Sequence, residues 1–302
     1  MFNAAMLSIE QGLLYAIMAL GVYITFRILD FPDLTVDGSF TTGGAIAAVV
    51  IAGGGSPLLG TLLALLGGLV AGACTGLLHT KGKINALLSG ILMMIALYSI
   101  NLRIMDKKAN IPLLGTDTLL TNVQILLVMP LVVIALKLLV DWFLHTDLGL
   151  ALRATGDNPR MIRSFGVNTD STIIMGVSLS NGMVALAGAL VAQYSAFAEI
   201  TMGVGMIVIG LASVIIGEAL FGARTVFRAT LAVLLGAIVY RLVVAVALRV
   251  GLDPIDMKLM TALIVIVALT LPRIQSSYRQ KALIRKRAGQ LVQGGQTDGG
   301  GR

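Results

Sequence analysis

The sequence predicts an all-α protein that crosses a membrane many times. Hydrophobic residues make up 57% of the 302 residues and charged residues only 12%, whereas a soluble domain carries about 25% charged residues. The mean hydropathy is +0.94. The apolar residues fall in long runs, and roughly 20 such residues in a helix span the hydrocarbon core. A soluble enzyme, a disordered chain and a disulfide-rich scaffold are therefore excluded.

About nine segments meet the length criterion for a spanning helix. They cover approximately residues 6–26, 34–52, 58–78, 84–103, 123–144, 172–194, 206–221, 227–248 and 254–271. The second and seventh are short, rich in Gly, Ala and Ser, and follow acidic irregular stretches that contain Asp30, Asp33 and Asp37 or Glu199. Such segments are typical of broken or half-helices, which membranes tolerate only where protein or a water-filled cavity surrounds them.

The third segment carries a row of small residues at every fourth position. The row consists of Gly60, Ala64, Gly68, Gly72 and Gly76. Small residues on one helix face let two backbones approach closely in lipid. We expect this face to pack against another helix of the same subunit, with a dimer seam as the alternative.

The basic residues predict the orientation. About fifteen Lys and Arg residues fall in alternate loops and in the tail, against about five on the opposite side. Because Lys and Arg accumulate in cytoplasmic loops, we expect a cytoplasmic C-terminus and, with nine spans, an outer N-terminus. The net charge of +7 is thus explained by membrane topology, and no nucleic-acid partner is expected.

The sequence contains no recognisable catalytic, metal or cofactor site. Neither HExxH nor GxSxG occurs, and Gly82-Lys83 lacks the glycines of a nucleotide-binding P-loop. The single cysteine, Cys74, excludes a multi-cysteine metal site. We expect no enzyme activity, no cofactor and no ATP hydrolysis by this chain.

Four polar residues inside the apolar segments are candidates to line a translocation pathway: Asn101, Asn181, Gln193 and Arg241. A charge at the centre of a spanning helix costs about 2.5–3.5 kcal/mol on insertion scales, so its presence suggests a cavity or a partner. For Arg241 the alternative is a structural strut between helices. Asn181 and Gln193 can both donate and accept hydrogen bonds.

The longest polar interruption, residues 145–170, predicts two short helices. Gly156 is a natural helix stop, and Asn158 followed by Pro159 is a strong helix start. The second helix should end near Gly166. Met161, Ile162 and Phe165 fall on one face of it, beside Arg160 and Arg163. A helix this short is marginal in water, so its apolar face must be covered. The cover is either the membrane ends of the protein's own helices together with lipid headgroups or, as we favour, a groove in a cytoplasmic partner.

Three stretches resemble one family. The first stretch is 151–159 (ALRATGDNP) with Arg163, Gly166 and Val167. The second is the N-terminal GLLYA and ALGV runs leading to Asp37-Gly38-Ser39, and the third is 210–217 (GLASVIIG). They are similar to permeases of bacterial ABC importers of the branched-chain amino-acid and ribose class. The resemblance covers most of residues 1–272 and is closest to permeases of tryptophan/tyrosine importers. Glu218-Ala219 departs from the family, which continues with glycine after Gly217.

The resemblance implies a type II ABC importer-like permease in the bacterial inner membrane. Residues 1–272 would be the transmembrane domain, and 273–302 a basic, Gly-rich cytoplasmic tail. Cytoplasmic ABC ATPase subunits, an extracytoplasmic solute-binding protein of lipoprotein type and a second permease copy would complete it, carrying a small solute such as an aromatic amino acid. The residues implied in coupling to the ATPase are Arg153, Ala154, Thr155, Gly156, Asp157, Asn158, Pro159, Met161, Ile162, Arg163, Phe165 and Gly166.

An ion-coupled secondary transporter or channel is the alternative function. Such a protein would work without an ATPase. The sequence lacks an acidic pair at helical spacing, a row of arginines and a carbonyl filter, which are the usual chemistry of that class. Sodium sites can also be built from backbone carbonyls, so the alternative stays open at the level of the sequence.

Overall fold

The computed structural model describes residues 2–121 and 124–249, and beyond them only positions 259, 261–263, 266–267 and 270. The helices are α1 (Phe2–Tyr23), continued by the π-helical turn η1 (Ile24–Ile28), α2 (Thr35–Ala52), α3 (Pro57–Thr80), α4 (Ala86–Ile104), α5 (Ile125–His145), α6 (Asp147–Asp157), α7 (Pro159–Ser164), α8 (Thr169–Ser195), α9 (Met206–Phe221) and α10 (Val226–Arg249). Two short strands, β1 (Asn110–Pro112) and β2 (Phe197–Glu199), pair antiparallel with Ile111 opposite Ala198.

The all-α, polytopic fold class is confirmed. Within the described residues, seven helices are long and apolar enough to cross a membrane, and α9 is a shorter apolar helix. The first eight expected segments each correspond to one helix, with bounds that differ by a few residues at most. The ninth segment, 254–271, and the tail, 273–302, lie outside the described residues except for the isolated positions given above.

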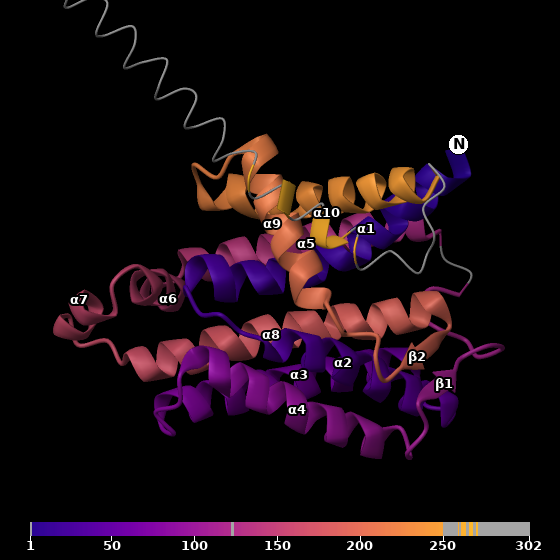
Figure 1. The fold of residues 1–302 in the computed structure, drawn as a ribbon, viewed down its shortest axis with the longest axis horizontal. Coiled ribbons are helices and arrows are strands. Elements are labelled where there is room, and N and C mark those ends of the chain that lie inside the picture. Colours follow the sequence, from indigo (N-terminus) through magenta and orange to yellow (C-terminus); the bar gives the residue numbers. More distant parts are fainter. Residues whose placement is uncertain are drawn as a thin grey trace, which may run out of the picture.

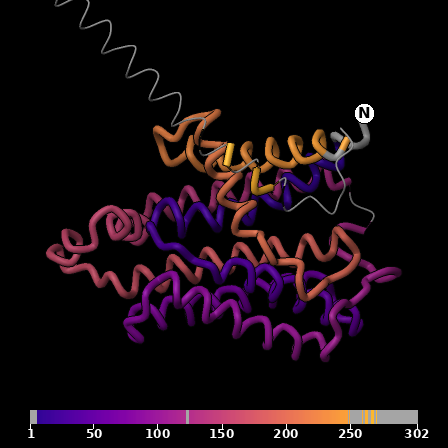
Figure 2. Tube along the Cα trace, viewed as in Figure 1, coloured from indigo at the N-terminus to yellow at the C-terminus, as the bar shows by residue number. Residues whose placement is uncertain are grey.

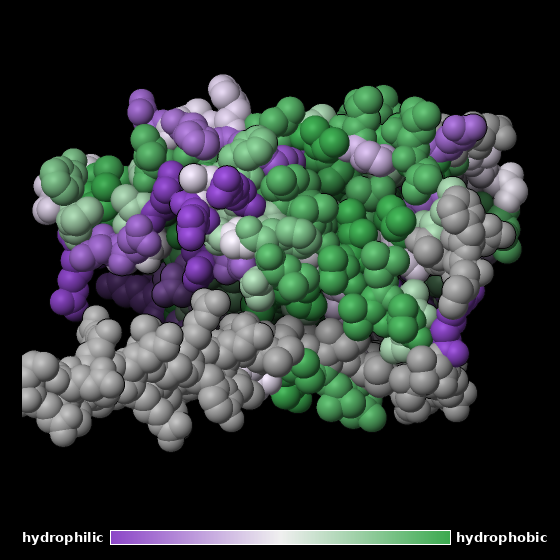
Figure 3. All heavy atoms as spheres, turned by 90° about the horizontal axis from the view of Figure 1, so that it is seen from above, coloured by the Kyte–Doolittle hydropathy of each residue, from purple (hydrophilic) through white to green (hydrophobic). Residues whose placement is uncertain are grey.

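The long helices run side by side along one axis (Figure 1), with α1, α5 and α10 in one layer and α2, α3, α4 and α8 in the other. The two strands lie at one end of the bundle, and α6 and α7 at the other. On the face shown in Figure 3, hydrophobic side chains cover the middle, and hydrophilic ones gather at the end that carries α6 and α7. This distribution fits an apolar band between two polar ends.

The row of small residues on α3 packs against α8. A Cβ built on Gly68 would lie 2.4 Å from the Asn181 carbonyl oxygen, and one on Gly72 would lie 2.4 Å from the Val177 carbonyl oxygen. These backbones therefore touch without intervening side chains, which is the geometry that small residues permit in membranes. The prediction of packing within one subunit is confirmed.

Two helices begin inside the bundle rather than at its ends. After η1 the chain turns back through Leu29, Phe31 and Asp33, all buried, before α2 starts near the middle of the long axis (Figure 1). After β2 the chain returns through Gly203, and α9 starts at a similar depth and runs to the opposite end (Figure 2). Of these two segments only α9 is a shorter apolar helix, as the half-helix interpretation expects, whereas α2 is long enough to cross a membrane. Protein surrounds the irregular backbone before both helices, as the membrane requires.

The α3–α8 contact generates a stability prediction. Gly72→Ala places a methyl group against a fixed backbone oxygen, so we expect it to lower the unfolding temperature by several degrees, which corresponds to an overpacking cost of about 1–3 kcal/mol. Gly67→Ala is the matched control, since its Cβ would meet only side-chain atoms, the flexible Cδ1 of Ile46 at 2.6 Å and the Cγ2 of Thr42 at 3.6 Å. Thermal unfolding in detergent measures both. Equal unfolding temperatures would contradict the packing argument.

Candidate functional site: the elbow between α5 and α8

Residues 145–170, here called the elbow, form two capped helices. Thr146 caps α6 by accepting a hydrogen bond from the Gly149 N–H. Asn158 ends α6 and also caps α7, with its side-chain oxygen 3.1 Å from the Met161 nitrogen and Pro159 in the first turn. Gly166, at φ +85°, terminates the second helix in the left-handed conformation that favours glycine. The predicted start and stop of α7 are confirmed.

The expectation that Gly156 stops the first helix is wrong. The helix continues to Asp157. Gly156 lies in its last turn, where a Cβ would stand 1.9 Å from the Ile28 carbonyl oxygen. A glycine is needed here for close approach to the end of η1, and not for helix termination.

The helix α6 is anchored to the membrane bundle. Leu152 is fully buried in the main core. The Thr155 hydroxyl lies 2.9 Å from the Thr172 hydroxyl of α8, and Gly149 lies against the backbone of Phe143 and Leu144 in α5. A force on the elbow therefore reaches α1, α5 and α8 directly.

The helix α7 projects from the bundle with no buried residue. Met161 is 49% exposed and Phe165 is 75% exposed, while Ile162 is only partly covered. Arg160 is exposed beside them. An apolar pair with adjacent arginines at a protruding tip is a surface suited to a groove in another protein.

Arg163 holds α7 to the start of α8. Its Nε donates to the Thr169 hydroxyl at 2.5 Å, and its Nη2 lies 3.6 Å from an Asp170 carboxylate oxygen. Because the guanidinium is 60% exposed, this ion pair orients the tip more than it stabilises the fold.

A polar cavity of about 420 Å³ adjoins the elbow. Arg153 and Asp157 of α6 line it together with Arg27 and Glu218. Arg27 Nε donates to Glu218 Oε1 at 3.0 Å, joining the end of α1 to the end of α9. Glu218 stands where the resembling permeases continue with glycine. It pairs with a basic residue at this end of the bundle. Ala154, half-buried in α6, does not line the cavity.

Two of the four pathway candidates are fully hydrogen-bonded inside the fold. Asn181 of α8 donates to Asp33 Oδ2 at 2.6 Å and accepts from Ser39 at 2.7 Å. Gln193 donates to Thr61 at 2.8 Å and accepts from the Leu119 N–H at 3.0 Å. Both residues tie separate segments together, so their present geometry is that of structural struts.

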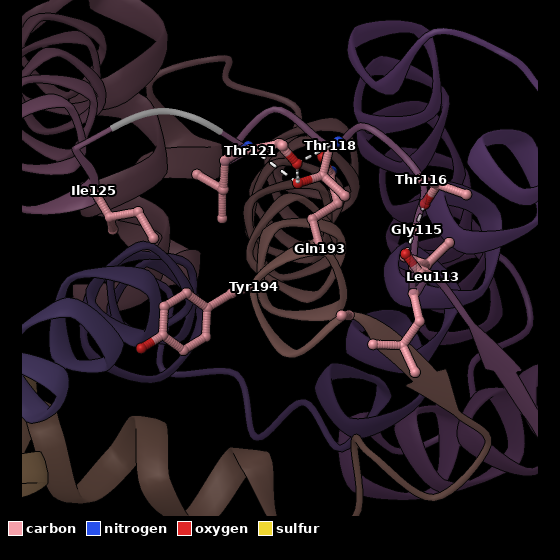
Figure 4. A pocket seen from close by; sticks show the side chains of 11 residues that line it. Leu113, Gly115, Thr116, Thr118, Thr121, Ile125, Gln193 and Tyr194 are labelled. Carbon is pink, nitrogen blue, oxygen red and sulfur yellow. Dashed lines mark hydrogen bonds between the residues drawn. The ribbon is translucent and has the colours of Figure 1, made fainter.

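Gln193 also lines a cavity of about 270 Å³ at the strand end of the bundle (Figure 4). The loop that carries Leu113, Thr118 and Thr121 forms one side, and Tyr194 at the end of α8 forms part of the other. The Tyr194 hydroxyl donates to Glu10 at 3.1 Å. This cavity faces the end opposite to the elbow.

The other two candidates are less fully bonded. Arg241 stacks its guanidinium 3.8 Å from the centroid of the Tyr15 ring, and its buried Nε has no hydrogen-bond partner among the described residues. Asn101 donates to the Gly38 carbonyl at 3.3 Å, but its buried Oδ1 has no described partner. Asn101 and Gln193 line two different cavities, and neither of these two cavities has Asn181 or Arg241 in its lining.

Asp37 occupies a structural position that the sequence interpretation did not predict. Its Oδ2 accepts from the Gly205 N–H at 2.9 Å and its Oδ1 from the Ile207 N–H at 2.8 Å. It therefore caps α9 from another helix, and its negative charge complements the positive end of the helix dipole. The sequence signals for this residue are the acidic stretch before α2 and the Asp37-Gly38-Ser39 run of the family resemblance, and neither indicates a partner in α9.

A buried ion pair in α5 was also missed. Lys137 Nζ bonds Asp141 Oδ2, and Asp141 Oδ1 accepts from the Thr230 hydroxyl of α10 at 2.7 Å. The ammonium also lies 3.2 Å from the centroid of the Phe227 ring. The spacing of four residues within an apolar run was visible in the sequence. Among the residues described, no group of His, Cys, Asp or Glu could hold a metal ion.

A bundle of long apolar helices with an elbow that protrudes at one end defines a multi-pass membrane protein. A family model described as "Branched-chain amino acid transport system / permease component" matches residues 5–270. The chain therefore belongs to this family of ABC transporter permeases.

Individual relatives agree with this assignment. The chain is 45% identical to the "Tyrosine transport system permease protein" of Clostridioides difficile (strain R20291), over 89% of this chain and 92% of the relative. It is 33% identical to the "Uncharacterized protein RP368" of Rickettsia prowazekii, over 89% and 97%. The "Ribose import permease protein RbsC" of Escherichia coli (strain K12) is 26% identical over 69% and 67%. No solved structure matches the chain.

The α5 ion pair generates a second stability prediction. Lys137→Met leaves the Asp141 carboxylate buried without its cation, so we expect a destabilisation of about 3–5 kcal/mol. The double variant Lys137→Met, Asp141→Leu removes both charges and should unfold close to the wild-type temperature. Thermal unfolding in detergent compares the three proteins. A double variant as unstable as the single one would contradict a purely electrostatic cost.

Proposed function

We propose that the chain forms the translocation pathway of an ATP-driven importer of a small solute, namely an amino acid, with an aromatic amino acid favoured. Its membership of the permease family supports transport, and the relative named as a tyrosine transport permease supports the substrate class. The bilayer is the bacterial cell membrane, and two copies of the chain work together. ATP is hydrolysed by separate subunits.

The single observation that carries the ATP-driven mechanism is the exposed α7 tip on the anchored α6. Met161 and Phe165 would enter a groove of a cytoplasmic ATPase, and Arg160 and Arg163 would meet its rim. When the ATPase subunits close, α6 would transmit the displacement to α1, α5 and α8. The residues proposed as a set to couple the two proteins are 153–159, 161–163, 165 and 166.

The side of the elbow follows from charge. Four connections that carry basic residues lie at one end of the bundle (Figure 1). They are the η1 turn with Arg27, the α3–α4 turn with Lys81 and Lys83, the elbow, and the α9–α10 turn with Arg224. By the positive-inside rule this end is cytoplasmic. The strand end would then face the solute-binding protein. The tail, 273–302, is proposed to be cytoplasmic too, with its basic residues at anionic headgroups.

The coupling role predicts that Phe165→Asp abolishes assembly with the ATPase. Burying a carboxylate in an apolar groove without a partner is strongly unfavourable, so copurification of the ATPase from detergent should fall at least tenfold while membrane insertion is unchanged. Leu114→Asp, an equally drastic change of an exposed residue at the strand end, is the matched control and should leave copurification intact. Arg163→Glu should behave as Phe165→Asp does.

The transport role predicts uptake of L-tyrosine by proteoliposomes that contain the permease, its ATPase and the solute-binding protein. Uptake should require ATP and should not respond to a sodium or proton gradient. Uptake driven by an ion gradient through the permease alone would instead establish the ion-coupled alternative and overturn this proposal.

A further inference from the structure

A third cavity lies between the start of α2 and the middle and end of α4. It has a volume of about 410 Å³, within the range of about 300–1,000 Å³ that small-molecule sites occupy. Its lining comes from α2, α4 and the segment that leads into α9: Asp37, Gly38, Thr41, Met94, Ile95, Tyr98, Asn101, Ile200 and Val204. The cavity therefore lies in membrane-spanning segments, at the point where α2 and α9 begin.

The polar groups of this cavity can recognise a cation. Asp37 is the one carboxylate in its lining, and the lining contains no basic residue. An ionised carboxylate offers about four acceptor positions, and the N–H groups of Gly205 and Ile207 use only part of them. Asp37 is partly exposed, so the remaining positions are accessible.

Asn101 supplies an independent indication of a ligand. Its side chain is 1% exposed, and its Oδ1 has no partner among the described residues. A buried acceptor left unsatisfied costs about 1–3 kcal/mol. The amide nitrogen donates to the Gly38 carbonyl, so the buried oxygen is the free end. A rotation of the side chain would present this oxygen to a hydrogen-bond donor in the cavity, such as an ammonium group.

The remaining walls are apolar and aromatic. Met94, Ile200 and Val204 cover one part, and Ile95 and Tyr98 of α4 remain 59% and 52% exposed along the other. A flat apolar ring would fit against the Tyr98 ring and the Met94 thioether. The exposed side of α4 leaves the cavity open outward, where the second copy of the proposed dimer would shield it from lipid.

We propose that this cavity binds the translocated amino acid during its passage, with Asp37 and Asn101 accepting hydrogen bonds from the α-ammonium group and Tyr98, Met94 and Ile95 contacting the side chain. This assignment rests on the proposed function. It adds a membrane-embedded recognition step to any selection made by the solute-binding protein. It also gives Asp37 two simultaneous tasks, since the same carboxylate would hold the start of α9 and the solute.

The first test fills the cavity. In the reconstituted complex, Ile95→Trp should reduce ATP-dependent uptake of L-tyrosine at least tenfold, because the indole occupies the solute's place. Ile100→Trp is the matched control: it is the same substitution on the same helix, at an exposed position outside the cavity lining, and uptake should stay within twofold of wild type. Equal uptake by both variants would overturn the proposal.

The second test measures binding without transport. In a Cys74→Ala background, Ile95→Cys should react with a charged, water-soluble methanethiosulfonate reagent, and L-tyrosine should slow this reaction at least fivefold. 3-(4-Hydroxyphenyl)propionate, which lacks the amino group, should not protect. Ile100→Cys should show no protection by either compound. Absence of labelling at Ile95→Cys, or equal protection by the two compounds, would overturn the proposal.

The two proposals fail in different ways. If the wild-type complex does not take up L-tyrosine with ATP, the proposed function fails whatever the cavity variants do. If the wild-type complex transports L-tyrosine but Ile95→Trp transports it as well and Ile95→Cys is not protected, only the cavity assignment fails.

Discussion

The arrangement of the bundle depends on one hydrogen-bonded cap at its centre. Asp37 in the first turn of α2 holds the N–H groups of Gly205 and Ile207 where α9 begins. Backbone donors left open inside a membrane cost several kcal/mol each, so a helix that starts at that depth needs such an acceptor. The cap allows α9 to begin in the interior, and the break between β2 and α9 creates the wall of the cavity that we propose for the solute.

The same constraint explains how the irregular segments are tolerated. Asp33 is fully buried, accepts from the Thr35 N–H at 2.9 Å, and also accepts from Asn181 of α8. The carboxylate in the connection between α1 and α2 is thus satisfied by a backbone N–H from the first turn of α2 and by a side chain from a helix more than a hundred positions later. Polar residues in this bundle serve mainly to close the backbone breaks, and only a few remain free to meet a ligand.

Sequence reasoning reached the helices but not their long-range partners. The bounds of α9 and the caps of α7 follow from local signals, namely an apolar run between glycines and an Asn-Pro start. The partner of Asp37 lies 168 positions away, and no local pattern can indicate such a contact. Gly156 shows a different limit of prediction from the sequence. A glycine at this position is consistent both with the end of a helix and with close packing. The second reason applies here, because the Ile28 carbonyl lies too close for a side chain.

The bare contacts between α2, α3 and α8 restrict how the molecule can move. A Cβ on Gly43 would stand 1.9 Å from the Ala185 carbonyl oxygen, and one on Gly188 would stand 2.0 Å from that of Phe40, so α2 and α8 interlock as closely as α3 and α8 do. Contacts this close leave no space for a side chain or a lipid chain between the three backbones. These three helices must travel as one rigid block, and any alternation between two states must be a swing of the other helices around it.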